Sequence, residues 1–155
     1  METSTGKITD FDFLHGSWNV VNRRLRQRWV GSDDWDVFPA TSTCVSRLSG
    51  MSNIDQIDMP DRGFSGLTIR VFNVTTSQWS IWWVNSALGA LEPPVVGGFD
   101  GPVGTFTGQD ADNGRPVNVR FRWEVLGPDQ ARWEQAFSQE PDIWETNWIM
   151  EFARS

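Results

Sequence analysis

The sequence predicts an all-β protein, a single antiparallel up-and-down β-barrel of about ten strands with a short N-terminal helical plug. Three observations predict this class. After Gly16, turn-forming Gly, Pro, Asn or Asp residues recur about every eight to twelve residues. Between these marks apolar and polar residues alternate with the period of a strand, and no long helical pattern occurs. Consecutive hairpins of this number form two sheets or close on themselves, and we favour closure because it removes exposed sheet edges.

The elements follow in order from the N-terminus. Residues 1–10 are expected to form a flexible tail, and residues 11–155 a single domain. Thr9 or Asp10 can cap a short helical turn that stops at Gly16 and plugs the barrel. Asn113-Gly114 is the strongest hairpin signal. The expected strands are residues 17–30, 35–46, 52–59, 66–73, 78–85, 95–99, 104–110, 115–126, 130–138 and 143–154.

Size and charge limit the possible partners. The chain has 155 residues, the size of one domain, and thirteen basic against twenty acidic side chains give a net charge of −7. This charge repels phosphate backbones and anionic lipid, so neither nucleic acid nor a membrane is an expected partner. The arginines between Arg23 and Arg28 alternate along a strand and are interpreted as a solvated or ion-paired face. We expect a monomer or a homodimer that binds a small molecule.

Cysteine usage and the N-terminal residues predict the compartment. Cys44 is the only cysteine, which excludes an internal disulfide and a cysteine-based metal cluster. No apolar run at the N-terminus resembles an export signal, and no apolar stretch approaches the ~20 residues of a membrane helix. We therefore expect a cytoplasmic protein.

Strand periodicity assigns inward and outward faces. In the last three strands one face is apolar, and the other carries charges that can pair across strands. The inward face then contains Val119, Phe121, Trp123, Val125, Ala131, Trp133, Gln135, Phe137, Trp144, Thr146, Trp148, Met150 and Phe152. The same parity turns Trp83 and Asn85 inward. The alternation in residues 17–30 is too weak to fix a face, which leaves the orientation of Arg24 open.

The first and last predicted strands contain two sequence features that occur together in known barrels. Gly16-Ser17-Trp18 stands at the entrance to the first long strand, and Arg154 at the end of the last. Together they resemble the G-x-W opening and the terminal arginine of lipocalins and other calycins. This resemblance implies that Arg154 packs over Trp18 and closes one end of the barrel, with a cation on an indole face. Entry is then expected at the opposite rim.

Longer segments are similar to a set of uncharacterised bacterial single-domain proteins with a lipocalin-like barrel. These segments are residues 11–18, 53–55, 62–67, 78–83, 96–101, 132–138 and 144–154. The resemblance implies the fold, but no activity, because the set has none that is agreed. Such proteins often have a Gly-rich turn before the last strand, where this chain has Gln139-Glu140-Pro141-Asp142.

The first hypothesis for function is the binding of one small, mostly apolar, aromatic molecule inside a Trp-lined barrel. Ten Trp and ten Phe with no Tyr supply flat apolar walls, and a few polar groups would orient a ring. The candidate ligand-binding residues are Arg24, Asn53, Trp83, Asn85, Trp123, Trp133, Gln135 and Trp148. The competing interpretation is that these aromatic side chains simply fill the core.

The second hypothesis is a cofactor-independent enzyme, a lyase, isomerase or cyclase acting on a polyketide-like or aromatic metabolite. Desolvation in an apolar barrel raises the pKa of a carboxyl group toward the range useful for general acid–base catalysis. The candidate catalytic acids are Asp55 and Glu134. No cofactor or metal is expected, because one His and one Cys are too few for the usual metal sites and no Gly-rich phosphate loop opens a helix.

Overall fold

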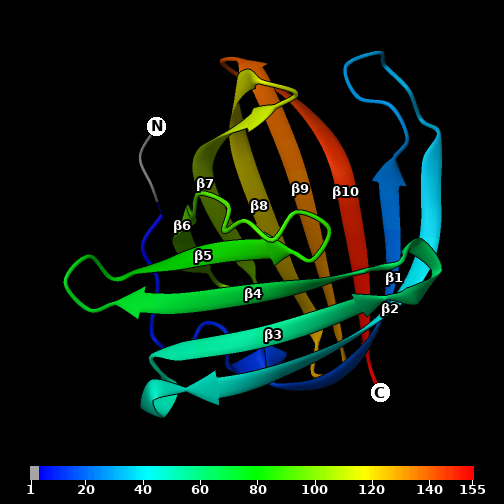
Figure 1. The fold of residues 1–155 in the computed structure, drawn as a ribbon. Coiled ribbons are helices and arrows are strands. Elements are labelled where there is room, and N and C mark those ends of the chain that lie inside the picture. Colours follow the sequence, from blue (N-terminus) through cyan, green and yellow to red (C-terminus); the bar gives the residue numbers. More distant parts are fainter. Residues whose placement is uncertain (1–3) are drawn as a thin grey trace.

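The computed structural model describes residues 4–155 and shows a closed, ten-stranded antiparallel barrel (Figure 1). The strands are β1 (Gly16–Leu25), β2 (Trp35–Arg47), β3 (Ser52–Met59), β4 (Phe64–Asn73), β5 (Gln78–Asn85), β6 (Val95–Asp100), β7 (Val103–Asp112), β8 (Arg115–Gly127), β9 (Gln130–Glu140) and β10 (Ile143–Arg154). Three short 3-10 turns accompany them: η1 (Asp12–Leu14), η2 (Leu48–Gly50) and η3 (Pro60–Arg62). In the view of Figure 1, β3–β5 cross the front and β7–β10 run up the back, as tilted barrel strands do.

The strands follow one another around the barrel in sequence order, and β1 pairs with β10 to close it. The β1–β10 pairing is antiparallel and places Trp18 opposite Arg154 and Arg24 opposite Trp148. The Asn113-Gly114 hairpin is present, and both of its residues have positive φ, as a tight two-residue turn requires. The predicted all-β class, the up-and-down order and the closure of the barrel are thereby confirmed.

The prediction of an N-terminal helical plug is wrong. The segment contains only the three-residue turn η1, which no side chain caps, and Phe11 rather than Thr9 or Asp10 precedes it. Phe11 and Leu14 are nevertheless buried in the core. A single 3-10 turn is sufficient here because burial of these side chains, rather than helix propensity, holds the segment. No helix within residues 4–155 is long and apolar enough to cross a membrane.

Residues 4–10, expected to belong to a flexible tail, lie along β5 and β6. Gly6 N donates a hydrogen bond to Ser77 O at 2.7 Å, and Trp79 Nε1 donates to Lys7 O at 2.9 Å. A carboxylate oxygen of Asp10 accepts a further hydrogen bond from the backbone of β6 at 3.2 Å. These bonds attach the segment to the barrel wall. Residues 1–3 of the expected tail lie outside the described residues.

The first strand is shorter than its sequence pattern indicates, because β1 ends at Leu25 instead of residue 30. Residues 26–30 belong to the loop that follows, and within it Trp29 has a φ of 69°, a left-handed conformation that strands do not contain. Trp18 and Asn22 are buried, which fixes the inward face of β1. With this parity Arg24 also points inward, and its side chain lines a cavity.

The inward face of β10 changes phase at a β-bulge. A register shift between Thr146 and Trp148 leaves Asn147 as the extra residue, opposite the region of Gln135. Trp148 is inward as predicted, but Trp144 and Thr146 precede the bulge and lie on the outer face, where an arginine of β8 covers the Trp144 ring. The expected inward orientation of Trp144 and Thr146 is therefore wrong, because one extra residue reverses the faces of a strand.

One end of the barrel, the closed end, is filled by Trp18, Arg154 and the residues of η1. The Arg154 guanidinium lies 4.0 Å from the centre of the Trp18 ring. Its Nη1 and Nη2 atoms donate to His15 O and Phe13 O, each at 2.8 Å. Trp18 Nε1 donates to Leu14 O, also at 2.8 Å. The stacked indole and guanidinium thus both hold the backbone of residues 13–15 across the end of the barrel.

Candidate functional site

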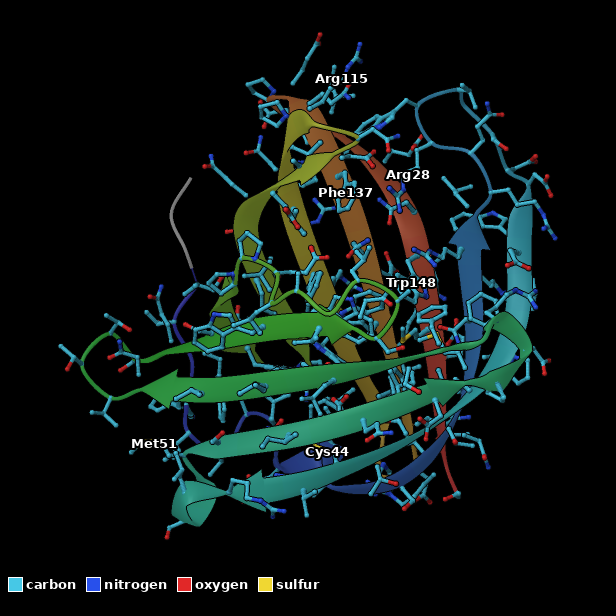
Figure 2. All side chains as sticks on the ribbon, in the orientation of Figure 1. Arg28, Cys44, Met51, Arg115, Phe137 and Trp148 are labelled. Carbon is cyan, nitrogen blue, oxygen red and sulfur yellow. The ribbon has the colours of Figure 1, made fainter. Side chains whose placement is uncertain are left out.

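A cavity occupies the barrel between the closed end and the opposite rim. Its inner part has a volume of about 60 Å³ and is lined by β2–β5 and β8–β10. Its outer part, of about 230 Å³, lies at the rim beside the β5–β6 loop. The two parts share walls, which are Ile81, Trp83, Phe121, Gln135 and Trp148. Figure 2 shows Trp148 midway along the barrel, with Phe137 and Arg28 nearer the rim.

Four rings, which we call the aromatic slot, line the inner part of the cavity. The Trp148 ring lies edge-to-face with Trp133, at 5.7 Å between ring centres, and with Trp83 at 6.1 Å. Phe121 adds the fourth ring, 5.0 Å from Trp133. Flat apolar surfaces set at steep angles to one another suit a planar ring. Gly66 makes room for Trp83, because a Cβ atom there would lie 1.8 Å from the indole.

Polar groups behind the aromatic slot fix the orientation of its largest ring. Trp148 Nε1 donates to Asn22 Oδ1 at 2.9 Å, and Asn22 is fully buried. Gln135 Nε2 donates to Asn147 Oδ1 at 2.8 Å, which ties the bulge of β10 to β9. A buried donor without a partner costs about 1–3 kcal/mol. The bond to Asn22 therefore favours one orientation of Trp148.

An ion pair forms the floor of the inner cavity. Asp55 from β3 and Arg70 from β4 line it together, with Arg70 Nη1 2.7 Å from Asp55 Oδ2. The same Nη1 atom donates to Asn53 Oδ1 at 2.8 Å. Both charged residues are buried, Arg70 with 3% and Asp55 with 6% of its surface exposed. Taking two charges out of water costs several kcal/mol per ion, so the pair is weak evidence of a purely stabilising role.

Two hydrogen-bond donors at this floor have no partner. Arg70 Nε and Asn53 Nδ2 are buried and reach no acceptor within residues 4–155. The guanidinium instead lies against two rings, 5.1 Å from the centre of Phe11 and 5.7 Å from that of Trp123. Burial raises the pKa of the neighbouring Cys44 thiol to about 11, so this thiol stays protonated at neutral pH. The floor therefore carries a buried ion pair, but no thiolate nucleophile.

The sequence pattern does not single out Arg70. In β4 the apolar Leu67, Ile69 and Val71 alternate with smaller or polar residues, and apolar sets normally face a barrel interior. The structure has the opposite arrangement, because Arg70 is buried inside and Ile69 lies on the outer face, in register with apolar residues of β3 and β5. One feature of the sequence could have identified Arg70. Its charge is opposite to that of Asp55, and the two residues lie on neighbouring strands.

The rim of the outer cavity is charged. The Arg24 guanidinium lies 4.5 Å from the centre of the Trp148 ring, and burial together with the charge of Arg28 lowers the pKa of Arg24. Glu92 and Asp110 line another part of the rim. Their shared hydrogen bond, with burial, raises the pKa of Glu92 to about 7. A cation and a proton-sharing acid pair thus border the same opening.

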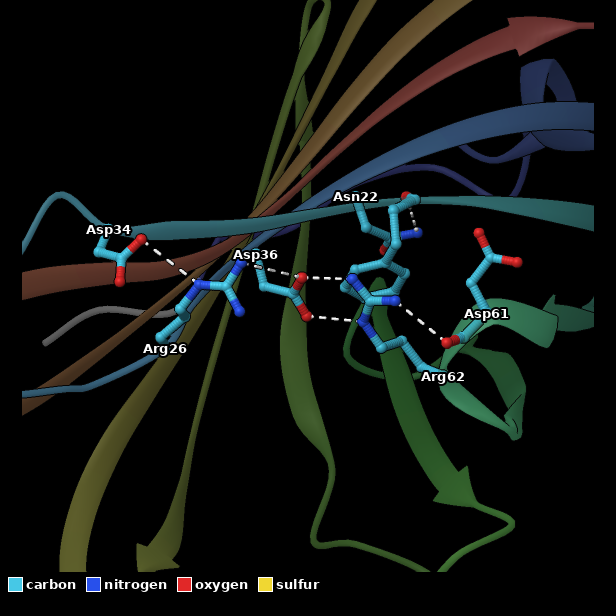
Figure 3. A network of polar contacts seen from close by, with 7 residues as sticks. Asn22, Arg26, Asp34, Asp36, Asp61 and Arg62 are labelled. Carbon is cyan, nitrogen blue, oxygen red and sulfur yellow. Dashed lines mark hydrogen bonds and ion pairs between the residues drawn. The ribbon is translucent and has the colours of Figure 1, made fainter.

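Further ion pairs hold the β1–β2 loop near the rim. Arg28 Nη1 lies 2.7 Å from Asp112 Oδ1, and Trp29 Nε1 donates to Asp112 Oδ2 at 2.9 Å. On the outer side Asp36 accepts hydrogen bonds from Arg62 and pairs with a second arginine, as Figure 3 shows. The bonds from Arg62 hold the pKa of Asp36 below its usual range. These contacts fix the loop without occupying the cavity.

The remaining predicted residues lie in three places. Trp123 lines the inner cavity, and Asn85 lines the outer part, where its Oδ1 also accepts a backbone N–H of the following turn at 2.9 Å. Glu134 lies on the outer face of β9, 3.0 Å from Arg132. The structure therefore brings Asp55 to the cavity but places Glu134 outside it. Within residues 4–155, no group of three His, Cys, Asp or Glu side chains is arranged to hold a metal ion.

Comparisons with known proteins agree with the fold. No protein-family model and no curated protein matches the chain. Among solved structures, a redesigned β-barrel with 11% sequence identity superposes with a TM-score of 0.53, over 99% of this chain and 99% of its own. An S-type phycobiliprotein lyase from Guillardia theta is 9% identical and has a TM-score of 0.55, over 94% of this chain and 90% of its own. At these identities the likeness is one of fold alone.

Proposed function

We propose that this chain is a lipocalin-like binding protein that holds one small, mostly apolar, aromatic molecule in its barrel. The observation that carries the proposal is the cavity itself. The aromatic slot lines it between a charged rim and the Asp55–Arg70 floor. Ligand pockets are typically of this kind, apolar with a few placed polar groups. Burying an apolar ring there contributes roughly 25 cal/mol for each Å² removed from water.

A fluorescence titration of the full chain with naphthalene tests this proposal. We expect saturable quenching of tryptophan emission with one site per chain. Two matched variants locate the site: Trp133→Leu removes a ring of the aromatic slot, and Trp144→Leu removes one on the outer face. Affinity should fall about tenfold or more in the first variant, a change of ~1.4 kcal/mol, and stay unchanged in the second. An equal effect of both variants, or no saturable quenching, would contradict the proposal.

A second candidate is a cofactor-independent enzyme that uses the same cavity. One observation favours it: Asp55 lines the cavity, where a bound molecule can reach its carboxylate. A structural neighbour is named as a lyase, so a barrel of this fold can serve an enzyme. The test is turnover of any aromatic metabolite that binds. Asp55→Asn should abolish turnover while the outer Glu134→Gln retains it, and retained turnover in Asp55→Asn removes that residue from the mechanism.

A further inference from the structure

Arg24 is a cation at the mouth of the cavity, and its side chain projects inward from β1 to line the outer part. The guanidinium lies 4.5 Å from the centre of the Trp148 ring and 5.9 Å from that of Phe64. Within residues 4–155 the side chain makes no hydrogen bond, and no carboxylate oxygen lies within 4.0 Å of it. A guanidinium carries five N–H donors, and the two rings supply no oxygen for them.

The acids around this mouth are already paired with other arginines. Arg28 Nη1 lies 2.7 Å from Asp112 Oδ1. Asp36 is the cross-strand neighbour of Arg24, but it accepts two hydrogen bonds from Arg62, as Figure 3 shows. It also pairs with a second arginine. Arg24 is therefore left without a direct counter-ion at the wall of the cavity.

The surroundings of Arg24 disfavour its charge. Burial and the charge of Arg28 lower the pKa of Arg24, and the charge of Asp36 opposes them only in part. An anion at the mouth would counteract both effects, because a nearby opposite charge favours the charged form. Arg120 also stacks on a tryptophan, but on the outer face of the barrel. The position of Arg24 inside the mouth is what makes it available to a ligand.

The cation and the aromatic walls are adjacent, because Arg24 contacts a ring of the aromatic slot. That ring belongs to Trp148. The aromatic walls common to the inner and outer parts of the cavity are Trp83, Phe121 and Trp148. A ring that lies against these walls therefore has its rim-facing end beside Arg24. The reverse orientation gives an anion no advantage, since the two charges at the floor neutralise each other at 2.7 Å.

The acid pair of Glu92 and Asp110 also lines the outer part of the cavity. Asp110 belongs to β7 and Glu92 to the β5–β6 loop, and in strand order both lie on the side of the barrel opposite β1. The pKa of Glu92 is raised to about 7 by the hydrogen bond with Asp110 and by burial. Below this pH the pair keeps a proton, which limits its repulsion of an anion bound at Arg24.

We infer that the ligand is an aromatic carboxylate, whose ring lies against the aromatic slot and whose carboxylate accepts hydrogen bonds from Arg24 at the rim. The planar fork of an arginine matches the two oxygens of a carboxylate and can donate to both. This inference rests on the proposed binding function and adds the chemical class of the ligand.

A pair of ligands tests the inference without altering the protein. Naphthalene-2-carboxylate and naphthalene-2-carboxamide have the same ring and nearly the same shape, but only the first is charged. Isothermal titration of the full chain at about pH 6 keeps the carboxylate ionised and Glu92 protonated. The carboxylate should bind at least tenfold more tightly than the carboxamide, or about 1.4 kcal/mol. Naphthalene serves as the ring without a polar end.

Protein variants then assign the preference to the rim. Arg24→Met keeps an unbranched side chain beside Trp148 but removes the charge. It should bind naphthalene like the wild type, and the difference between the carboxylate and the carboxamide should disappear. The matched control is Arg23→Met, which removes a charge from the neighbouring, exposed position of the same strand and should keep the preference.

The possible results separate the two proposals. Equal affinity of the wild-type chain for the carboxylate and the carboxamide, with naphthalene still bound, overturns the inference and leaves the binding function standing. This comparison does not depend on the folding of any variant. A preference that persists in Arg24→Met, or that is lost equally in Arg23→Met, also overturns the inference, because Arg24 is then not its source. Failure of all three compounds to bind overturns the binding function together with the inference.

Discussion

The closed end and the floor of the cavity each place an arginine against a tryptophan, but the two arginines differ in their hydrogen bonds. At the closed end the Arg154 guanidinium lies 4.0 Å from the Trp18 ring and donates to backbone carbonyls. Beside the cavity, Arg70 lies 5.7 Å from Trp123 and keeps a donor unpaired. The first arrangement pairs the donors of its arginine, and the second leaves one donor without an acceptor. We therefore expect substitutions at the closed end to change mainly stability, and substitutions at the cavity to change mainly ligand binding.

The largest expected effect is at the closed end. Trp18→Ala removes an indole with 1% of its surface exposed and should lower the free energy of unfolding by about 3–5 kcal/mol. Urea denaturation measures this. Trp144→Ala, on the outer face, is the control and should cost clearly less. Equal costs would break the comparison, because the closed end would then not be the stabilising region.

Removal of the closing arginine should have the next largest effect. Arg154→Met leaves the carbonyls of His15 and Phe13 without their donor and should cost about 1–3 kcal/mol of unfolding free energy. Arg120→Met is the matched control, since Arg120 also stacks on a tryptophan, at 4.6 Å, but on the outer face. Its cost should stay below about 1 kcal/mol. Both variants should bind naphthalene like the wild type, and a loss of binding in Arg154→Met alone would mean that the two regions are coupled.

A glycine substitution should affect the cavity more than the fold. Gly66→Ala places a Cβ atom 1.8 Å from the Trp83 indole, so the ring must move. Naphthalene affinity should fall about tenfold, and overpacking should cost roughly 1–3 kcal/mol of stability. Gly127→Ala, where an added Cβ meets no heavy atom within 4 Å, is the control. Unchanged affinity in Gly66→Ala would show that Trp83 does not contact the ligand.

The smallest expected effect is a pH dependence at the rim. The hydrogen bond with Asp110 and burial raise the pKa of Glu92 from 4.5 to about 7, so the folded state binds this proton more tightly than the unfolded chain does. Stability from this group is therefore fully present below about 4.5 and is lost as pH rises to about 7. Glu92→Gln should remove that part of the pH dependence of the urea midpoint. An identical pH profile in the variant would contradict this assignment.

Strand positions could be predicted because turn residues mark strand ends. Residues 78–85 and 143–154, expected from the pattern, coincide with β5 and β10. The extent of β1 could not be predicted, because residues 26–30 contain no Gly or Pro that separates the loop from the strand. Backbone conformations of single residues depend on tertiary contacts, such as the hydrogen bond from Trp29 Nε1 to Asp112.

The alternation of residues along the strands predicted the aromatic residues that line the site, but only some of its polar residues. Trp83, Trp133 and Trp148 line the cavity as expected from alternation. Arg70 could not be predicted as the floor of the cavity, because periodicity assumes that apolar residues face inward. In β4 the apolar face is outside and the arginine inside. Arg70 is held inside by its contacts with Asp55, Asn53 and two aromatic rings, and contacts between strands are a property of the folded register.

The most direct test of the account is a heteronuclear NMR titration of the full chain with naphthalene, observed at the indole N–H signals. The account predicts that the signals of the inner Trp83, Trp133 and Trp148 shift in a saturable manner, whereas that of the outer Trp144 stays in place. Ser42→Leu, which fills the inner cavity, should abolish the shifts, and Thr43→Leu, on the exposed face of the same strand, should preserve them. Shifts confined to Trp144, or undiminished binding in Ser42→Leu, would contradict the account.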